Sequence, residues 1–217
     1  MPIAGMMRAN GGMFLPEDEQ DKVMIGGGAQ YQGNKLRAAL KHVKQARTAI
    51  DIGAHCGLWS VQLGQYFERV ECFEPLQRHI ECWQRNVGWK ATCHLHEVAL
   101  GAEKGSCGMT VIGGLSGRSH VNGDGPVPVH VLDDYGFEDV DFLKADVEGY
   151  EYFALKGGEK TLLRCKPVMV IEQKPQHGGA ARYGLSDRAA LDYLETLGAK
   201  VVDELAGDYV LTWGAAQ

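Results

Sequence analysis

Long apolar runs are missing from this sequence. No stretch reaches the roughly 18 apolar residues that a membrane-spanning helix needs, so we expect no transmembrane segment. The N-terminal stretch MPIAGMMRANGG has one arginine and no long apolar core, which argues against a signal peptide. Together with the scattered, unpaired cysteines described below, these two absences favour a reducing, cytoplasmic location.

An excess of basic residues is also missing. The 22 Lys and Arg residues are outnumbered by 28 Asp and Glu residues, which gives a formal net charge of -6 at pH 7. Proteins that bind phosphate backbones or anionic membranes rely on clustered basic side chains. We therefore expect neither a nucleic acid nor a membrane surface as the main partner.

Paired cysteines, internal repeats and low-complexity segments are absent as well. The six cysteines are scattered and include no CxxC pair, so the sequence predicts neither a disulfide framework nor a structural metal site. Several lie in apolar, strand-like runs, where a free cysteine behaves as a small hydrophobic side chain. The 217 residues, 45% of them hydrophobic, suffice for one domain with a large core.

What the sequence does contain is a regular alternation of strand-like and helix-like segments. The strand-like segments are 48–54, 69–75, 92–100, 141–149 and 167–174, and the helix-like segments between or after them are 57–67, 76–87, 150–164 and 186–198. This alternation predicts an α/β fold, a mostly parallel sheet with helices on both faces and strand order 3-2-1-4-5. A short turn between the last two strands, 199–205 and 208–213, predicts a C-terminal antiparallel hairpin.

Two segments fall outside this alternation. Residues 1–47 contain Gly-rich turns and an amphipathic helix at 34–47, and we predict an N-terminal extension that forms a flap. Residues 101–140 contain short strands around a Gly-rich loop, and we predict a β insertion beside the carboxyl edge of the sheet. Both segments belong to a single predicted domain, residues 1–217.

The turn after the first strand, DIGAHCG, indicates a ligand. Gly53 and Gly57 lie at a strand-to-helix turn, where glycines permit a sharp bend or a close approach to the backbone. In open α/β sheets, ligands bind outside the carboxyl ends of the strands. Glu74 ends the second strand, and a carboxylate there can accept both hydroxyl protons of a ribose. With Glu97 near the end of the third strand, these residues predict an adenosine-type site.

The spacing of the glycines distinguishes two cofactor classes. The sequence has GxxxG in place of the pyrophosphate-binding GxGxxG. Asp51, two residues before Gly53, disfavours a phosphate and suits a positively charged amino group or a sulfonium. The combination favours S-adenosylmethionine. An NAD-dependent oxidoreductase and a non-catalytic binding module remain the alternatives, and glycines placed only for packing are the simplest rival explanation.

Several of these stretches resemble the FkbM family of class I S-adenosylmethionine-dependent methyltransferases. They are DIGAHCGLWS, VECFEP, VALG and, most specifically, VDFLKADVEGYEYFALKGGEKTLLRCKPVMVIEQK, and the resemblance covers roughly residues 49–174. His55 stands where the family usually has Asn, and Cys56 is unusual beside it. The resemblance implies a Rossmann-like class I methyltransferase fold and methyl transfer, usually to a hydroxyl of a sugar or natural product, with S-adenosylhomocysteine as the product.

The predicted cofactor site gathers residues from four strand ends. Glu74 would hold the ribose, and Glu97 to Ala99 would flank the adenine. The full set of predicted cofactor-binding residues is Asp51, Gly53, Ala54, His55, Gly57, Leu58, Glu74, Pro75, Glu97, Val98, Ala99 and Asp146.

The acceptor side requires residues that orient a hydroxyl and take its proton. Asp146, at the tip of the fourth strand, is the first candidate, and its alternatives are a contact to the cofactor's amino group or a structural hydrogen bond. Glu148 is a second candidate, although an acid at a helix start also satisfies backbone N–H groups. Glu172, which ends the fifth strand, and His120, in the insertion, complete the catalytic candidates.

Other polar residues give weaker signals. Asp146, Glu172 and His177 are a minor candidate for a cation site, and we predict no resident metal. Tyr31 and Gln32 are candidates to close over the cofactor from the flap. The expected partner is a small molecule or glycan that offers a hydroxyl, and neither its identity nor the oligomeric state follows from the sequence.

Overall fold

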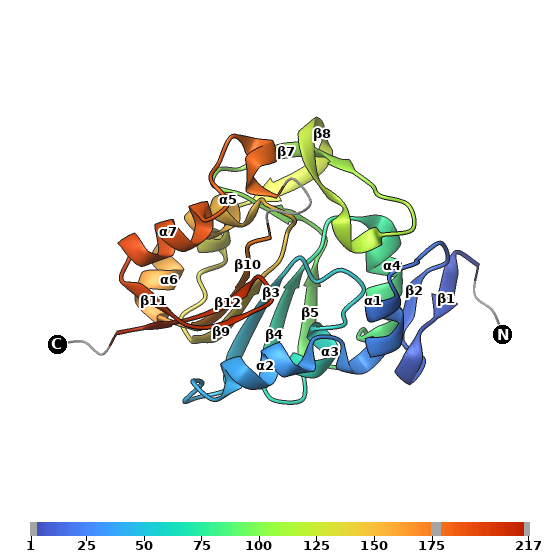
Figure 1. Cartoon of the computed structure of the whole chain (residues 1–217), viewed down its shortest axis with the longest axis horizontal. Helices are drawn as coiled ribbons and strands as arrows, with labels where there is room; N and C mark the ends of the chain where they lie inside the picture. Colours follow the sequence, from blue (N-terminus) through green and yellow to red (C-terminus); the bar gives the residue numbers. More distant parts are fainter. Residues whose placement is uncertain (1–3, 175–178, 215–217) are drawn as a thin grey trace.

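The computed structural model describes residues 4–174 and 179–214, and a seven-stranded sheet forms its centre (Figure 1). The strands follow the order β11-β12-β10-β9-β3-β4-β5. Five are parallel: β3 (Thr48–Ile52), β4 (Arg69–Phe73), β5 (Cys93–His96), β9 (Val140–Ala145) and β10 (Val168–Glu172). The predicted α/β class and the order 3-2-1-4-5 are confirmed.

The last two strands form the predicted antiparallel hairpin. They are β11 (Ala199–Leu205) and β12 (Asp208–Trp213), and β12 also pairs with β10. Ala206 and Gly207 in the turn have φ angles of 54° and 83°. Positive φ at both central residues matches the right-handed twist of the paired strands.

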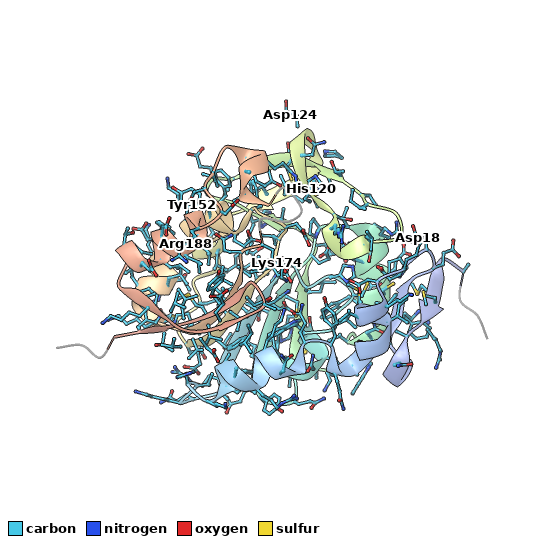
Figure 2. The ribbon with its side chains drawn as sticks, in the orientation of Figure 1. Asp18, His120, Asp124, Tyr152, Lys174 and Arg188 are labelled. Atoms are coloured by element: carbon cyan, nitrogen blue, oxygen red, sulfur yellow. The ribbon has the colours of Figure 1, made fainter. Side chains whose placement is uncertain are left out.

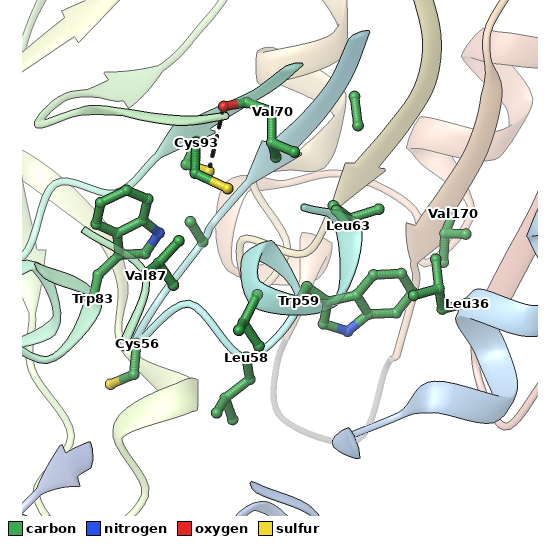
Figure 3. Close-up of a cluster of buried hydrophobic side chains, with 14 of the residues drawn as sticks. Leu36, Cys56, Leu58, Trp59, Leu63, Val70, Trp83, Val87, Cys93 and Val170 are labelled. Atoms are coloured by element: carbon green, nitrogen blue, oxygen red, sulfur yellow. Dashed lines mark hydrogen bonds between the residues drawn. The ribbon is translucent and has the colours of Figure 1, made fainter. Parts of the chain in front are cut away.

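Two layers of helices bury the two faces of the sheet. One layer has α2 (Gly33–Leu40), α3 (Ser60–Leu63) and α4 (Gln77–Asn86), and the other has α5 (Glu151–Lys156), α6 (Glu159–Cys165) and α7 (Ala189–Thr196). All five residues of β3 are buried, as in a strand covered on both faces. Figure 3 shows the hydrophobic core between the sheet and the layer of α2, α3 and α4, which includes Trp59, Leu63 and Val170.

Several predicted elements are shorter or divided, among them the helix predicted at 34–47, which is α-helical only as α2, Gly33–Leu40. The predicted helix 57–67 contains only α3 as α-helix, and the predicted helix 150–164 is divided into α5 and α6 at Gly157 and Gly158. Glycine is a poor helix former, and the Asp133 carboxylate caps the new start by accepting the N–H groups of Lys160 and Thr161 at 3.0 and 2.8 Å. The predicted strand 92–100 divides into β5 and β6 (Ala99–Leu100), which belong to different sheets.

The extension and the insertion lie at the periphery of the sheet (Figure 1). The extension contains the hairpin β1 (Met6–Arg8) and β2 (Phe14–Pro16), followed by α1 (Lys22–Gly27). In the insertion, β7 (Gly105–Thr110) and β8 (His120–His130) form a separate three-stranded sheet with β6, which directly precedes the insertion. His120 is the first residue of β8, so β8 begins inside the segment predicted as a Gly-rich loop.

The hairpin of the extension is fastened to α4 by one buried amide. The Asn86 side chain accepts the N–H of Phe14 at 2.7 Å and donates to the carbonyl groups of Phe14 and Cys56 at 2.8 and 2.7 Å.

The six cysteines are free thiols, five of them buried. Among the helices of the described residues, none combines the length and apolarity needed to cross a bilayer.

Candidate functional site

A cavity of about 200 Å³ lies outside the carboxyl ends of β3, β4, β9 and β10. The strand order reverses at β3, because β4 follows on one side of it and β9 lies on the other. Open α/β sheets bind ligands at such a point. The roof comes from the extension, through Asp21, Met24 and Tyr31, and from the insertion, through the segment 115–121. The two peripheral segments therefore enclose the cavity against the sheet.

Most of the predicted site residues meet at this cavity. Those that line it are Gly53, Ala54, His55, Leu58, Glu74, Pro75, Val98, Ala99, His120, Asp146, Glu148 and Glu172. Asp51, Gly57 and Glu97 do not line it. Figure 2 labels two of the groups around the site, His120 on the insertion and Lys174 nearer the middle of the molecule.

Asp51 lies beneath the loop, fully buried. One carboxylate oxygen accepts the Ser60 hydroxyl at 2.7 Å, and the other lies 3.6 Å from the Lys144 ammonium with no hydrogen-bond partner among the described residues. Burial raises the pKa of Asp51, against the opposing effects of Lys144 and Ser60. In this arrangement Asp51 supports the loop from below, and its side chain does not face the cavity.

The two glycines of DIGAHCG permit close contacts with different parts of the protein. Gly53 has φ +76°, and a Cβ there would lie 2.0 Å from the carbonyl oxygen of Asp146. Gly57 has φ +83°, and its Cβ would lie 2.4 Å from Val87 and 2.9 Å from Trp83. Gly53 thus lets the β3 loop touch the β9 loop at the cavity, whereas Gly57 lets the loop pack against α4.

Glu74 presents a carboxylate that the protein holds in a fixed orientation. The residue is 5% exposed, and its two oxygens accept the backbone N–H groups of His55 and Leu76, both at 2.9 Å. Nδ1 of His79 lies 3.1 Å from the same oxygen as Leu76. A carboxylate oxygen has about two acceptor positions, so Oε1 is already shared by two donors and Oε2 keeps one position for a ligand.

Asp146, Glu148 and Glu172 bring three carboxyl groups together, with one oxygen of each within 4.8 Å of the others. Burial works to raise the pKa of Asp146, but Lys144, 3.6 Å away, and a hydrogen bond from Glu172 hold it below its ordinary value. Burial and the charge of Asp146 raise the pKa of Glu172 well above its ordinary value. The two pKa values are therefore shifted in opposite directions, although Lys174, which pairs with Glu172, opposes the rise in the pKa of Glu172.

Glu148 adds a second weakly acidic carboxyl to this group. Its backbone has φ +57°, and burial, followed by the charges of Asp146 and Glu151, raises its pKa to about 8. Glu148 does not cap the following helix. Glu151, the first residue of α5, accepts the N–H groups of Val147 and Gly149 in the loop before the helix, at 2.8 and 3.1 Å. Asp146 and Glu172 already neighbour Lys144 and Lys174, and His177, the third predicted cation ligand, lies outside the described residues.

Lys144 is a residue of the site that the sequence reasoning missed. It is 5% exposed, donates to the Gly53 carbonyl at 3.1 Å and lies between Asp51 and Asp146, 3.6 Å from each. Burial favours the neutral amine, yet the two carboxylates raise the pKa of Lys144. A lysine in the otherwise apolar part of this strand, FLKA, was the available signal, because a buried lysine requires a partner.

The flap residues have separate positions. Tyr31 lines the cavity, whereas Gln32 accepts the indole N–H of Trp59 at 2.8 Å and donates to the Tyr31 hydroxyl at 3.1 Å. His120 lies in the roof, where its Nδ1 donates to the Arg118 carbonyl at 2.9 Å. Tyr31 and His120 therefore approach the cavity from the side opposite the sheet.

Comparison with protein families identifies this architecture. Residues 51–201 match the methyltransferase FkbM domain. The match covers more than half of the chain, and the chain therefore belongs to the FkbM methyltransferase family. Among curated proteins, no significant match is found.

Solved structures share the fold. A methyltransferase FkbM from Methylobacillus flagellatus is similar with a TM-score of 0.50 and 19% identity, over 76% of this chain and 43% of that one, so this chain spans less than half of that protein. A Streptococcus mutans protein described as a methyltransferase, in complex with S-adenosylhomocysteine, has a TM-score of 0.53 and 13% identity, over 82% of this chain and 94% of that one. An rRNA methylase from Streptococcus thermophilus has a TM-score of 0.52 and 12% identity, over 83% of this chain and 95% of that one. At these identities the likeness concerns the fold, a class I methyltransferase fold.

Proposed function

We propose that this protein is an S-adenosylmethionine-dependent methyltransferase that methylates a hydroxyl group of a sugar or a natural-product small molecule. One observation carries the proposal. A pre-oriented carboxylate that suits a ribose, Glu74, shares a single cavity with an ionised carboxylate that suits a hydroxyl acceptor, Asp146. Family membership supports the reaction class.

The residues of the cavity fit this cofactor. Besides the fixed Glu74 carboxylate, Nε2 of His79, a residue that lines the cavity, is buried without a hydrogen-bond partner among the described residues. Unpaired acceptors beside a carboxylate suit a ligand that brings hydroxyl or amino donors, and adenosine has both. Pro75, Val98 and Ala99 offer apolar contacts for the adenine. Asp51 acts indirectly in this proposal, through Lys144 and Gly53.

S-adenosylmethionine supplies an electrophilic methyl group when bound, and the chain must orient the acceptor oxygen. Asp146 accepts the hydrogen bond of the acceptor hydroxyl and takes its proton. The hydrogen bond between Glu172 and Asp146 keeps the Asp146 carboxylate in place. Glu148 borders the same space, and His120 is the remaining basic candidate, from the roof.

The proposal is tested by turnover with methyl-labelled S-adenosylmethionine and a panel of free sugars, nucleotide sugars, phenols, amines and thiols. The expected product carries the label on oxygen, as located by mass spectrometry and NMR. Label transferred to an amine or thiol but not to any hydroxyl would contradict the hydroxyl assignment. A surface variant such as Asp134→Asn, far from the proposed chemistry, serves as the active control.

A further inference from the structure

His55 is connected to both parts of the roof by a short chain of hydrogen bonds. Its Nε2 lies 2.8 Å from the hydroxyl oxygen of Ser116, in the insertion. The hydroxyl and the backbone N–H of Ser116 both approach Oε2 of Glu19, in the extension, with the N–H at 3.1 Å. Oε1 of Glu19 accepts the N–H groups of Gln20 and Asp21 at 2.9 and 2.8 Å. Glu19 and Ser116 are 5% and 1% exposed, so water does not substitute for these contacts.

The chemistry of these groups sets the direction of the chain. An ionised carboxylate can only accept hydrogen bonds, so the Ser116 hydroxyl donates to Glu19. The hydroxyl oxygen then has only lone pairs for His55, and His55 must donate from Nε2–H. Burial, followed by the neighbouring His79 and Lys144, lowers the pKa of His55 well below its ordinary value, so the ring is neutral. A neutral imidazole with its proton on Nε2 has a bare Nδ1.

His55 lies beside the proposed ribose site. The backbone N–H of His55 donates to Oε2 of Glu74 at 2.9 Å, the His55 ring centroid lies 4.1 Å from that of His79, and His55 is one of the residues that line the cavity. In the described part of the chain, Nδ1 of His55 has no hydrogen-bond partner. His55 therefore presents a hydrogen-bond acceptor next to a carboxylate, where a ribose would bring hydroxyl donors.

We propose that Glu19 and Ser116 fix the tautomer of His55, so that Nδ1 accepts a hydrogen bond from a ribose hydroxyl of the cofactor. The inference rests on the proposed cofactor site. Glu19 acts as a positioning residue, because it reaches the cofactor only through Ser116 and His55. The extension and the insertion thus contribute to cofactor recognition as well as to closure of the cavity.

The tautomer is tested first, in the protein without cofactor. Long-range ¹H–¹⁵N correlations of the histidine rings are expected to show His55 with a protonated Nε2 and an unprotonated Nδ1. Ser116→Ala is expected to remove this preference. A protonated Nδ1 in the native protein would overturn the inference, whatever the outcome for the cofactor.

Cofactor affinity is tested next, by isothermal titration with S-adenosylhomocysteine. Glu19→Gln and Ser116→Ala should each weaken binding about tenfold, the order of one hydrogen bond, and the double variant should be little worse than either. Glu17→Gln is the matched control, because Glu17 is exposed on the same segment.

The outcomes separate the inference from the proposed function. Failure of the native protein to bind S-adenosylhomocysteine would contradict the function itself. Native binding with unchanged affinity in the Ser116→Ala variant would contradict only the role of the chain from Glu19 to His55. If Glu19→Gln fails to fold, as judged by thermal unfolding, the Ser116→Ala comparison still decides.

Discussion

At the scale of single residues, the site depends on carboxyl groups that sit close together but differ in pKa. Lys144 and Glu172 lower the pKa of Asp146, while burial raises the pKa values of Glu172 and Glu148. This separation of pKa values within one cavity is the usual means by which a protein assigns different roles to the same residue type.

Asp146→Asn should abolish most turnover and preserve cofactor binding. The amide cannot take a proton, and removal of a general base typically lowers kcat by about 10²–10⁴-fold. Affinity for S-adenosylhomocysteine, measured by titration, should change by only a few fold. A variant with native kcat would show that Asp146 is not the base, and weakened cofactor binding with native kcat would assign it to the cofactor's amino group.

The raised pKa of Glu148 predicts a pH dependence of stability. Because the folded-state pKa, about 8, exceeds the ordinary value of 4.5, the stabilising effect is complete below pH 4.5 and is lost as pH rises through about 8. Wild-type protein should therefore lose unfolding free energy between pH 5 and pH 8 relative to Glu148→Gln, as measured by urea denaturation. Parallel pH curves for the two proteins would contradict this.

The lowered pKa of His55 predicts a pH dependence of stability with the opposite sign. Its folded-state pKa is lowered, so its contribution to stability is present above pH 6.5 and lost as pH falls below that value. The charged or titratable groups around it include His79, Lys144, Arg78 and Glu74. Wild-type protein should lose more unfolding free energy between pH 7 and pH 5 than His55→Asn does, and equal losses would contradict the lowered pKa.

At the scale of elements, α6 begins at a cap that lies far away in sequence. Asp133 accepts the N–H groups of Lys160 and Thr161 and the Thr161 hydroxyl. Asp133→Ala should lower the unfolding free energy by about 1–2 kcal/mol. Affinity for S-adenosylhomocysteine should stay at the wild-type level. The exposed neighbour Asp134, changed to Ala, is the control, and equal stability of the two variants would contradict the cap.

The boundaries of the elements show where sequence patterns lose information. Periodicity predicted the parallel strands because strands buried on both faces are continuous apolar runs. It could not divide the segment 92–100 between two sheets, because pairing depends on partners distant in the chain. Similarly, the end of α5 depends on the pair Gly157–Gly158 and on Asp133, which a local helical pattern does not contain.

At the scale of the whole molecule, the site depends on segments that local patterns did not connect. The sequence placed Glu74 and Asp146 at strand ends, and the structure brings both to one cavity. Asp51 was expected to face the ligand, yet its side chain points to Ser60 and Lys144 beneath the loop. The sequence around Glu19 did not indicate a role in the site, because that role depends on its contact with Ser116 in the insertion, which lies far away in the chain.

The central claim is that this cavity binds S-adenosylmethionine through the carboxylate of Glu74, and isothermal titration of the purified chain tests it most directly. Titrations with S-adenosylmethionine, S-adenosylhomocysteine and NAD should show binding of the first two and none of the third. Glu74→Ala should weaken S-adenosylhomocysteine binding by at least tenfold, since a hydrogen bond to a charged group is worth about 1.5–3 kcal/mol. Binding of NAD alone, or undiminished binding in Glu74→Ala, would contradict the account.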